Sequence, residues 1–482
     1  MNKKFIILFL TIISIIFCDT KVIYAVNTVP TEEKKQEAEE RKLMRVESNE
    51  WNNWPQGPIL GCESAILVDV DTGTILYEKN IHEELYPAST TKIMTALLTI
   101  ENTSMDEIVT FSHDAIFNVD SDSSRIGIDV GEQLTVEQCL YGLLLGSANE
   151  VAYALAEHIG GSLSGFVDMM NSRAKSLGCE NTHFINANGL PDKDHYTSAY
   201  DLSLIARECF KNEAFANISG TRSYTIPATN IQSQERPLDN HHLMIHGFRY
   251  EYDGFVGGKT GYTTEARQTL VSCAERNGVR LICIIMKEES PDQFLDTQKL
   301  FDYGFESFDR FNIKENETRY TMNSSTFFNT NIDIMGSSKP TLTLNENGYV
   351  ILPKNAVFED ATVQINYSED SGSSVATLDY YYSDNHVGST TLDYALDSES
   401  TFEFANIVRN SDKSEIPKSL KKDKKVVFIN IKLIIIIISI ILVAILLFIF
   451  WKSIYNRYTH SLHRRRKLKI KNLKNRKNNN DF

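Results

Sequence analysis

The chain has 482 residues, of which 42% are hydrophobic, enough for two or three domains with a sizeable core. Its formal net charge is −14, but basic clusters after residue 410 carry a net charge of +14, so the first 410 residues hold −28. Such acidity argues against nucleic-acid binding by the folded part, because that function requires a basic face. A solvated acidic surface that aids solubility accounts for it.

Residues 1–25 are typical of a cleavable export signal. Lys3 and Lys4 precede an apolar run over residues 5–17, and the segment ends on a small residue. An uncleaved membrane anchor is the alternative. Residues 26–58 are rich in Glu and Lys and have few apolar positions, so we expect them to form an exposed polar spacer.

A second hydrophobic segment lies towards the other end of the chain. Residues 433–451 carry no charge and are almost entirely Ile, Leu, Val and Phe, which is enough to cross a hydrocarbon core of about 30 Å. A buried core helix is the alternative, but the segment is apolar on all faces. The basic cluster after it is larger than the one before it, so we expect residues 452–482 to form a cytoplasmic tail. We therefore expect a single-pass protein of the cell membrane whose large folded part lies outside the cytoplasm.

Six of the seven cysteines remain once the signal is removed, an even number that permits disulfides in an exported protein. Four of the six lie within apolar helix or strand patterns, where a buried free thiol is the commoner state. We therefore expect most of them to be unpaired. The six are Cys62, Cys139, Cys179, Cys209, Cys273 and Cys283.

The sequence contains neither a Cys-x-x-Cys nor a His-Glu-x-x-His motif. His242 with His246 is a weak metal signal, and we expect these histidines to make local hydrogen bonds. We predict neither a metal ion nor a cofactor.

Strands are expected at both ends of the first large folded region, residues 59–312. Residues 64–70 and 74–79 flank a turn signal at Asp71-Thr72-Gly73, and residues 268–274 and 279–286 flank Asn277-Gly278. The pattern predicts an α+β fold in which the two ends of the region close one antiparallel sheet that helices cover. Apolar residues at helical spacing predict those helices at residues 93–100, 135–145, 151–159, 166–177 and 201–210.

The texture of the sequence changes after residue 312. Short alternating runs at residues 349–352, 362–365 and 374–378 are separated by Asn, Gly, Ser and Asp, which predicts a small all-β domain over residues 313–403. That region contains no catalytic constellation. A polar linker that carries lysines is expected over residues 404–432.

One serine stands out as a candidate nucleophile. A short polar segment that contains Ser89 runs directly into an apolar helical run, so Ser89 is expected at a helix start. Lys92 follows three residues later and lies on the same face. The helix N-terminus offers unpaired N–H groups and a partial positive charge to an anion formed there. A serine beside an amine in this field is a plausible activated nucleophile.

Ser-x-x-Lys alone is a weak signal, because an N-capping serine followed by an exposed lysine is the simpler interpretation. The same pattern occurs at residues 172–175 and 419–422. What distinguishes Ser89 is the presence, further along the chain, of Ser147-Ala148-Asn149 and then Lys259-Thr260-Gly261. Three motifs in this order form the set described for active-site-serine β-lactamases and penicillin-binding proteins.

With these motifs the chain resembles the D-alanyl-D-alanine carboxypeptidases, the low-molecular-mass penicillin-binding proteins of bacterial cell-wall metabolism. The likeness covers about residues 59–312 and includes Asn188-Gly189-Leu190-Pro191, residues 195–201 and Tyr262-Thr263. The β-rich region looks like that family's C-terminal stalk domain, and a membrane attachment near the C-terminus also fits. The resemblance implies a β-lactamase/transpeptidase-like fold.

The resemblance also implies an enzyme that removes the terminal D-alanine from peptidoglycan stem pentapeptides and that penicillins acylate at the same serine. Ser89 is then the nucleophile. Lys92 must be neutral to accept the serine proton, and enclosure in a cleft together with the second ammonium of Lys259 lowers its pKa. Ser147 can relay the proton towards the leaving amine, and Asn149 can hold Lys92 and the substrate backbone.

The third motif is expected to bind the substrate. Lys259 and Thr260 would hold its terminal carboxylate, and Gly261 lets their strand approach closely. By resemblance, the backbone N–H groups of Ser89 and Tyr262 form the oxyanion hole, and loss of such a donor typically costs about a hundredfold to a thousandfold in rate. The expected partners are therefore stem peptides, β-lactam antibiotics and the membrane.

The chain departs from the family pattern at three positions. Glu150 stands where the family commonly has Asp, and Arg267 stands where the family commonly has Gly. The family also commonly has Asn near the position of His242. None of these changes removes a catalytic group. Arg267 leaves the local strand geometry and the substrate preference open.

Three other functions compete with the carboxypeptidase. A class A β-lactamase would need a deacylating glutamate in a Glu-x-x-Leu-Asn context, which the sequence lacks. A transpeptidase shares the acyl-enzyme step and differs only in the acceptor. A non-catalytic wall-binding protein would have lost at least one of Ser89, Lys92 and Lys259, and all three are present.

Overall fold

A computed structural model describes residues 30–119, 123–319, 342–367 and 374–394. The expected signal (residues 1–25), linker (404–432), membrane helix (433–451) and basic tail (452–482) lie outside these residues. Within the described ranges, no helix is both long enough and apolar enough to cross a membrane.

A five-stranded antiparallel sheet organises the region before residue 308, with the order β2-β1-β9-β8-β7. Early strands pair with late ones, because β1 lies between β2 and β9. This confirms the predicted sheet closed by the two ends of the region. The strands are β1 (Ser64–Asp69), β2 (Ile75–Lys79), β7 (Phe255–Thr263), β8 (Arg267–Arg276) and β9 (Val279–Glu288).

The central strands are buried on both faces of this sheet. On β1, Ile66 and Val68 join a hydrophobic cluster with the helices, whereas Ala65 and Leu67 join a second cluster on the opposite face. This follows from the period of two along a strand. The second face is covered by α10 (Asp292–Ser307). Consequently the sheet is the middle of three layers, and side chains of β1 and β9 pack in both directions.

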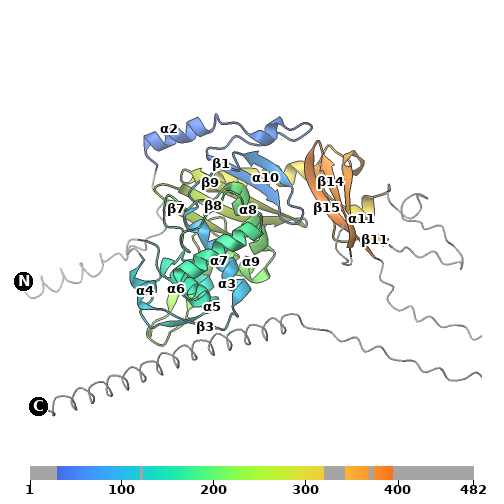
Figure 1. The fold of residues 1–482 in the computed structure, drawn as a ribbon. Coiled ribbons are helices and arrows are strands. Elements are labelled where there is room, and N and C mark those ends of the chain that lie inside the picture. Colours follow the sequence, from blue (N-terminus) through green and yellow to red (C-terminus); the bar gives the residue numbers. More distant parts are fainter. Residues whose placement is uncertain (1–29, 120–122, 320–341, 368–373, 395–482) are drawn as a thin grey trace, which may run out of the picture. The chain divides into compact units, whose positions relative to one another are not determined.

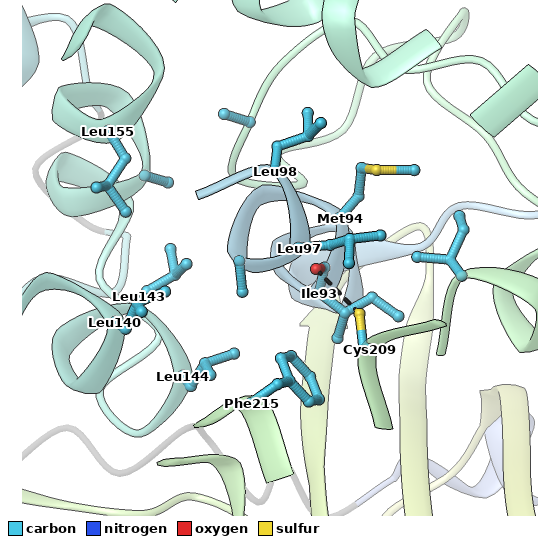
Figure 2. Packing of buried hydrophobic residues seen from close by; sticks show 14 of the residues in the cluster. Ile93, Met94, Leu97, Leu98, Leu140, Leu143, Leu144, Leu155, Cys209 and Phe215 are labelled. Carbon is cyan, nitrogen blue, oxygen red and sulfur yellow. Dashed lines mark hydrogen bonds between the residues drawn. The ribbon is translucent and has the colours of Figure 1, made fainter. Parts of the chain in front are cut away.

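Helices from the middle of the chain cover the first face, and Figure 1 shows α3, α5, α6 and α7 grouped there. The helix α3 runs through the centre of this group. Its residues from Ile93 to Thr99 are all buried, which is typical of a helix enclosed by others. Figure 2 shows its apolar side chains among those of α5, α6, α8 and α9. The bounds are α3 (Lys92–Asn102), α4 (His113–Phe117), α5 (Val136–Leu144), α6 (Asn149–Gly160), α7 (Leu163–Ser176), α8 (Ala199–Phe210) and α9 (Glu213–Gly220).

Two two-stranded antiparallel sheets were not expected from the sequence. They are β3 (Ile108–Thr110) with β4 (Gln133–Thr135), and β5 (Ser223–Ile226) with β6 (Arg236–Asp239).

All six cysteines in the described residues are free, which confirms the expectation of unpaired thiols. The sheet explains two of them. Cys273 on β8 faces the helices and Cys283 on β9 faces α10, so the sheet itself separates the two thiols. Cys209 on α8 is buried against α3, where its thiol donates to the carbonyl of Ile93 at 3.5 Å (Figure 2).

The N-terminal part of the region expected as a polar spacer is folded. It forms α2 (Glu32–Arg41) and the 3₁₀ helix η1 (Glu47–Glu50). Only Ala38 and Arg41 are buried on α2, so its outer surface is polar as expected. Trp54, however, is buried and contacts the ring of Phe308 at 5.2 Å. The structure therefore differs from the expected spacer because a few large or charged side chains attach this segment to the folded part.

The described residues after 307 form a second antiparallel sheet, with the order β10-β12-β15-β14-β13 and β11 paired to β15. The strand runs expected near residues 349, 362 and 374 are all present. The elements are β10 (Phe308–Asn312), α11 (Ile313–Asn316), β11 (Leu342–Leu344), β12 (Tyr349–Pro353), η3 (Phe358–Asp360), β13 (Thr362–Tyr367), β14 (Ser374–Tyr382) and β15 (Asn385–Tyr394).

Candidate active site

Ser89 lies in the 3₁₀ turn η2 (Ala88–Thr91), which runs directly into α3, so the predicted helix start is confirmed. Lys92 is the first residue of α3, and its Nζ lies 3.0 Å from Ser89 Oγ. The sheet holds this turn in place, because the hydroxyl of Thr269 on β8 donates to the carbonyl of Pro87 at 2.9 Å. The nucleophile candidate is thus fixed between the central helix and the sheet.

Lys92 is completely buried and has two further oxygen neighbours. Its Nζ donates to Oδ1 of Asn149 and to the carbonyl of Asn188, both at 2.6 Å. Burial is the main reason why the pKa of Lys92 lies well below its usual 10.5, and the ammonium of Lys259 lowers it further. A neutral amine has two N–H groups and one lone pair. With its N–H groups directed to Asn149 and Asn188, the lone pair is left to accept the proton of Ser89.

Ser147 and Asn149 lie at the turn between α5 and α6, where the sequence placed them. Ser147 is 4% exposed and has a φ of 54°, a conformation that residues other than glycine rarely adopt. Asn149 is the first residue of α6, and its backbone N–H donates to the carbonyl of Ser124 at 2.9 Å while its side chain holds Lys92. The second motif therefore meets the first one in space through the side chain of Asn149.

The third motif lies on β7, which is the edge strand of the sheet beside η2. Gly261 comes closest to the nucleophile: a Cβ at this position would lie 3.0 Å from Ser89 N and 2.2 Å from Thr269 Oγ1. Only glycine allows this approach, as the sequence predicted. Thr260 and Tyr262 flank Gly261 and are both partly exposed along the strand.

Lys259 precedes these residues on β7 and is 1% exposed. Its Nζ donates to the carbonyl of Thr260 at 2.8 Å, and burial lowers its pKa from 10.5 to about 7. An ammonium that burial destabilises gains most from an anionic ligand, since the ligand's charge offsets the loss of hydration. The position of Lys259 beside the free edge of β7 suits the carboxylate of a bound peptide.

A loop to which the sequence assigned no catalytic role completes the site. It supplies the carbonyl of Asn188 that accepts from Lys92, and the next residue, Gly189, has a φ of 87°. A Cβ on Gly189 would lie 1.8 Å from the carbonyl oxygen of Ala88. The Asn188-Gly189 pair indicated a turn here but not a role in the site, because a residue of any type can supply a backbone carbonyl.

His195 attaches this loop to the turn that carries the nucleophile. Its Nδ1 accepts the N–H of Ile185 at 3.0 Å, so Nε2 carries the proton and donates to Thr91 Oγ1 at 2.9 Å. Burial lowers the pKa of His195 to about 4, which keeps the ring neutral at physiological pH. The hydroxyl of Thr95 adds a second link, to the carbonyl of Ala187 at 2.6 Å.

Two of the three departures from the family pattern are accommodated locally. Glu150 is buried, and its Oε1 accepts the backbone N–H groups of Ile126 and Gly127 at 2.7 and 3.1 Å. His242 is buried against β7, with its Nε2 2.9 Å from the hydroxyl of Ser272. The third departure, Arg267, has a φ of 54° and pairs with Glu289.

The histidines suspected of metal binding make local hydrogen bonds, as expected. His242 contacts Ser272, and Nδ1 of the exposed His246 lies 2.5 Å from a carboxylate oxygen of Glu251. Across the part of the chain that the structure describes, no group of three or more His, Cys, Asp or Glu side chains is arranged to hold a metal ion.

The competing Ser-x-x-Lys pair at residues 172–175 lies on α7, where both Ser172 and Lys175 are exposed to solvent. The pair at residues 419–422 lies outside the described residues. Of the two pairs that the structure describes, only the Ser89 pair meets the other two motifs.

Comparison with known proteins agrees with this geometry. The family model described as D-alanyl-D-alanine carboxypeptidase matches residues 52–290. The chain is 36% identical over 264 residues to D-alanyl-D-alanine carboxypeptidase DacF of Bacillus subtilis, which is 53% of this chain and 65% of that protein. It is 33% identical over 257 residues to DacB2 of Mycobacterium tuberculosis, covering 52% of this chain and 84% of that protein.

One solved structure extends the similarity. The crystal structure of the D-alanyl-D-alanine carboxypeptidase DacD from Francisella tularensis superposes with a TM-score of 0.53 at 25% identity. The match covers 70% of this chain and 95% of that structure.

Proposed function

The chain belongs to the D-alanyl-D-alanine carboxypeptidase family, and from this premise we propose that it is a serine-type carboxypeptidase of peptidoglycan stem pentapeptides. The observation that carries the proposal is the buried Lys92, whose Nζ lies 3.0 Å from Ser89 Oγ and 2.6 Å from Asn149 Oδ1. The match spans 65% of the length of the Bacillus subtilis relative.

In the proposed reaction, Ser89 Oγ attacks the carbonyl carbon between the two D-alanines while Lys92 takes its proton. The C–N bond breaks, the proton passes by way of Ser147 to the departing amine, and D-alanine leaves. The shortened peptide stays bound to Ser89 as an ester. Water then hydrolyses the ester with Lys92 as the base and restores the serine.

The substrate is proposed to lie along the free edge of β7, with its terminal carboxylate at Lys259 and Thr260. Backbone N–H groups of Ser89 and Tyr262 would stabilise the oxyanion. The close approach of Gly261 to Ser89 N supports this arrangement, because it brings the strand and the helix start to the same reacting carbonyl. Penicillins carry a carboxylate beside a strained carbonyl and are proposed to acylate the same serine.

Substitution of the nucleophile tests the function. We expect Ser89→Ala to abolish covalent labelling of the full-length protein by a fluorescent penicillin, because no ester can form. Ser172→Ala removes the serine of the exposed pair on α7 and should leave labelling intact. Labelling that persists in a folded Ser89→Ala protein would contradict the assignment. A pentapeptide assay with and without an amine acceptor then separates hydrolysis from transpeptidation.

We further propose that the enzyme is exported and anchored in the cell membrane by residues 433–451, with residues 452–482 in the cytoplasm. The apolar character of the first segment and the larger basic cluster after it support this orientation. The proposed export signal and the proposed cell-wall substrate both fit an active site outside the cytoplasm.

A further inference from the structure

Arg267 has an unusual backbone for an arginine. It begins β8 with a φ of 54°, in the left-handed region that favours glycine. Its side chain is only 11% exposed, so it is surrounded mainly by other protein groups and not by water. A backbone outlier of this kind persists when its surroundings fix it, and it often marks a functional position.

The guanidinium of Arg267 joins two sides of the candidate active site. On one side, Nε donates to Glu289 Oε1 at 3.0 Å and Nη2 pairs with the other carboxylate oxygen, which makes the ion pair bidentate. On the other side, Nη1 donates to the hydroxyl of Tyr262 at 3.4 Å, and the guanidinium carbon lies 5.7 Å from the centre of the Tyr262 ring.

Glu289 continues the chain of contacts to the N-terminal segment. It is 4% exposed, and its Oε1 lies 3.6 Å from Nη2 of Arg41, the last residue of α2. Arg41 is itself fixed to the folded part: its Nε donates to the carbonyl of Gly61 at 2.7 Å, and its own carbonyl accepts from the buried Lys79 at 2.9 Å. Two ion pairs and one hydrogen bond in series therefore connect α2 to Tyr262, and the Arg41–Glu289 pair is made without a hydrogen bond.

Tyr262 lies where this series can affect the reaction. It follows Gly261, the residue whose backbone faces Ser89 N, on a strand whose outer edge is unpaired within its sheet. An edge strand is hydrogen-bonded to a neighbouring strand on one side only, so side-chain contacts help to fix the position of its end.

We infer that Arg267 is a positioning residue that, through Glu289 and Arg41, uses the N-terminal segment (residues 30–62) to hold the end of β7 against Ser89. The inference rests on the proposed function, because it concerns the rate of the same acylation. It gives a role to a segment that precedes all three catalytic motifs. It also explains why a side chain stands where the backbone favours glycine.

Arg267→Gly is the discriminating variant, because glycine adopts a φ of 54° without strain, so the effects come from loss of the arginine side chain and not from the backbone. The full-length variant should still fold, with a lowered thermal midpoint, because the buried Glu289 loses its bidentate partner. Its rate of acylation by penicillin and its kcat for the pentapeptide should fall by about tenfold or more, with KM changed far less, as expected for a displaced reacting group. Glu289→Gln should behave similarly, and the double variant should be no slower than Arg267→Gly alone, because both changes break one contact series.

Two further variants test the link to α2. Arg41→Met should slow acylation in the wild-type background and have no effect in the Arg267→Gly background. Arg45→Ala is the matched control: Arg45 lies four residues further along and pairs with Glu50 at the surface, where both side chains are more than half exposed, so the rate should not change.

An Arg267→Gly protein with the wild-type acylation rate would overturn the inference. So would an Arg41→Met effect of equal size in both backgrounds, because the two residues would then act independently. Wild-type protein and Ser89→Ala are measured in parallel. If penicillin does not label the wild type, both the proposed function and the positioning role of Arg267 are wrong. If the wild type is labelled but the Arg267 variants behave differently from expectation, only the positioning role is wrong.

Discussion

At the scale of single residues, the proposed reaction depends on two buried lysines that must carry different charges. Lys92 has to be neutral to accept a proton, and its burial among backbone and amide oxygens favours that state. Lys259 has to be an ammonium to bind a carboxylate, and burial brings its pKa to about 7. Burial lowers both pKa values, and the ammonium of Lys259 lowers the pKa of Lys92 further.

The two lysines predict a bell-shaped dependence of kcat/KM on pH for a substrate with a free carboxylate. Activity should be lost at low pH as Lys92 gains a proton, and lost above about pH 7 as Lys259 loses its proton. A substrate whose terminal carboxylate is an amide should bind poorly but lack the alkaline fall, because it does not need the charge of Lys259. Steady-state rates of both substrates between pH 4 and 10 provide the measurement. An identical alkaline fall for the amide would contradict the role of Lys259.

The sequence was sufficient to identify the side chains of this site but not the backbone groups between them. Ser89, Lys92, Asn149 and Lys259 could be predicted because their chemistry needs those residue types in a fixed order. The carbonyl of Asn188 could not, because any residue supplies a carbonyl and only the path of the chain brings this one to Lys92. The contact of Arg267 with Glu289 was equally hidden, since it joins positions that only the turn after β7 and the end of β9 bring together.

At the scale of elements, the loop at residues 183–190 behaves as a wall of the active site rather than a connection. Hydrogen bonds from Lys92, Thr95 and Thr91 by way of His195 attach it to η2 and α3. Gly189 allows its closest contact, against the carbonyl of Ala88. The position of Lys92 therefore depends on a loop almost a hundred residues away in sequence.

Gly189→Ala should disrupt this wall. The new Cβ would lie 1.8 Å from a backbone oxygen, so the loop has to retreat and Lys92 loses its carbonyl partner. We expect a fall in penicillin labelling of roughly tenfold or more and a loss of stability beyond the 1–3 kcal/mol typical of a strained φ alone.

Gly178→Ala is the control for that experiment. Gly178 has nearly the same φ, 89°, but its nearest foreign atom to a new Cβ is 3.9 Å away. The Gly178→Ala variant should lose only about 1 kcal/mol of stability, because alanine disfavours a left-handed backbone. Penicillin should label it as it labels the wild type. Equal labelling of the two alanine variants would show that the contact with Ala88 is unimportant.

The observed helices show where the apolar pattern of the sequence predicts secondary structure well. The five helices predicted from apolar spacing correspond to α3, α5, α6, α7 and α8, because each of them packs apolar side chains in the core. The helices α4, α9 and α10 were not predicted. The N-terminal α2 was not predicted, because almost nothing on it is apolar and it is held by Arg41 and Lys79. Attachment by a few buried charges depends on partners that are distant in sequence, so no periodicity reports it.

At the scale of the whole molecule, the proposed orientation in the membrane can be tested by accessibility. A single cysteine at Ser461, in the basic tail, should resist a membrane-impermeant thiol reagent in intact cells and react after lysis. A cysteine at Ser374, at the start of β14, should react without lysis where no outer membrane intervenes. The unmodified chain is the background control, because five of its six cysteines in the described residues are buried. The reverse pattern of reactivity would contradict both the topology and the role in the cell wall.

The complete burial of α3 from Lys92 to Thr99 has a consequence for how this domain can be monitored. Amide protons of a helix enclosed in this way can reach solvent only when the whole core opens, whereas those of a surface loop exchange through small local openings. Hydrogen–deuterium exchange in α3 therefore reads out the free energy of global unfolding at the helix that carries Lys92. Peptides from residues 183–190 should exchange sooner, and comparing the two segments before and after acylation would separate a stiffened loop from a stabilised protein.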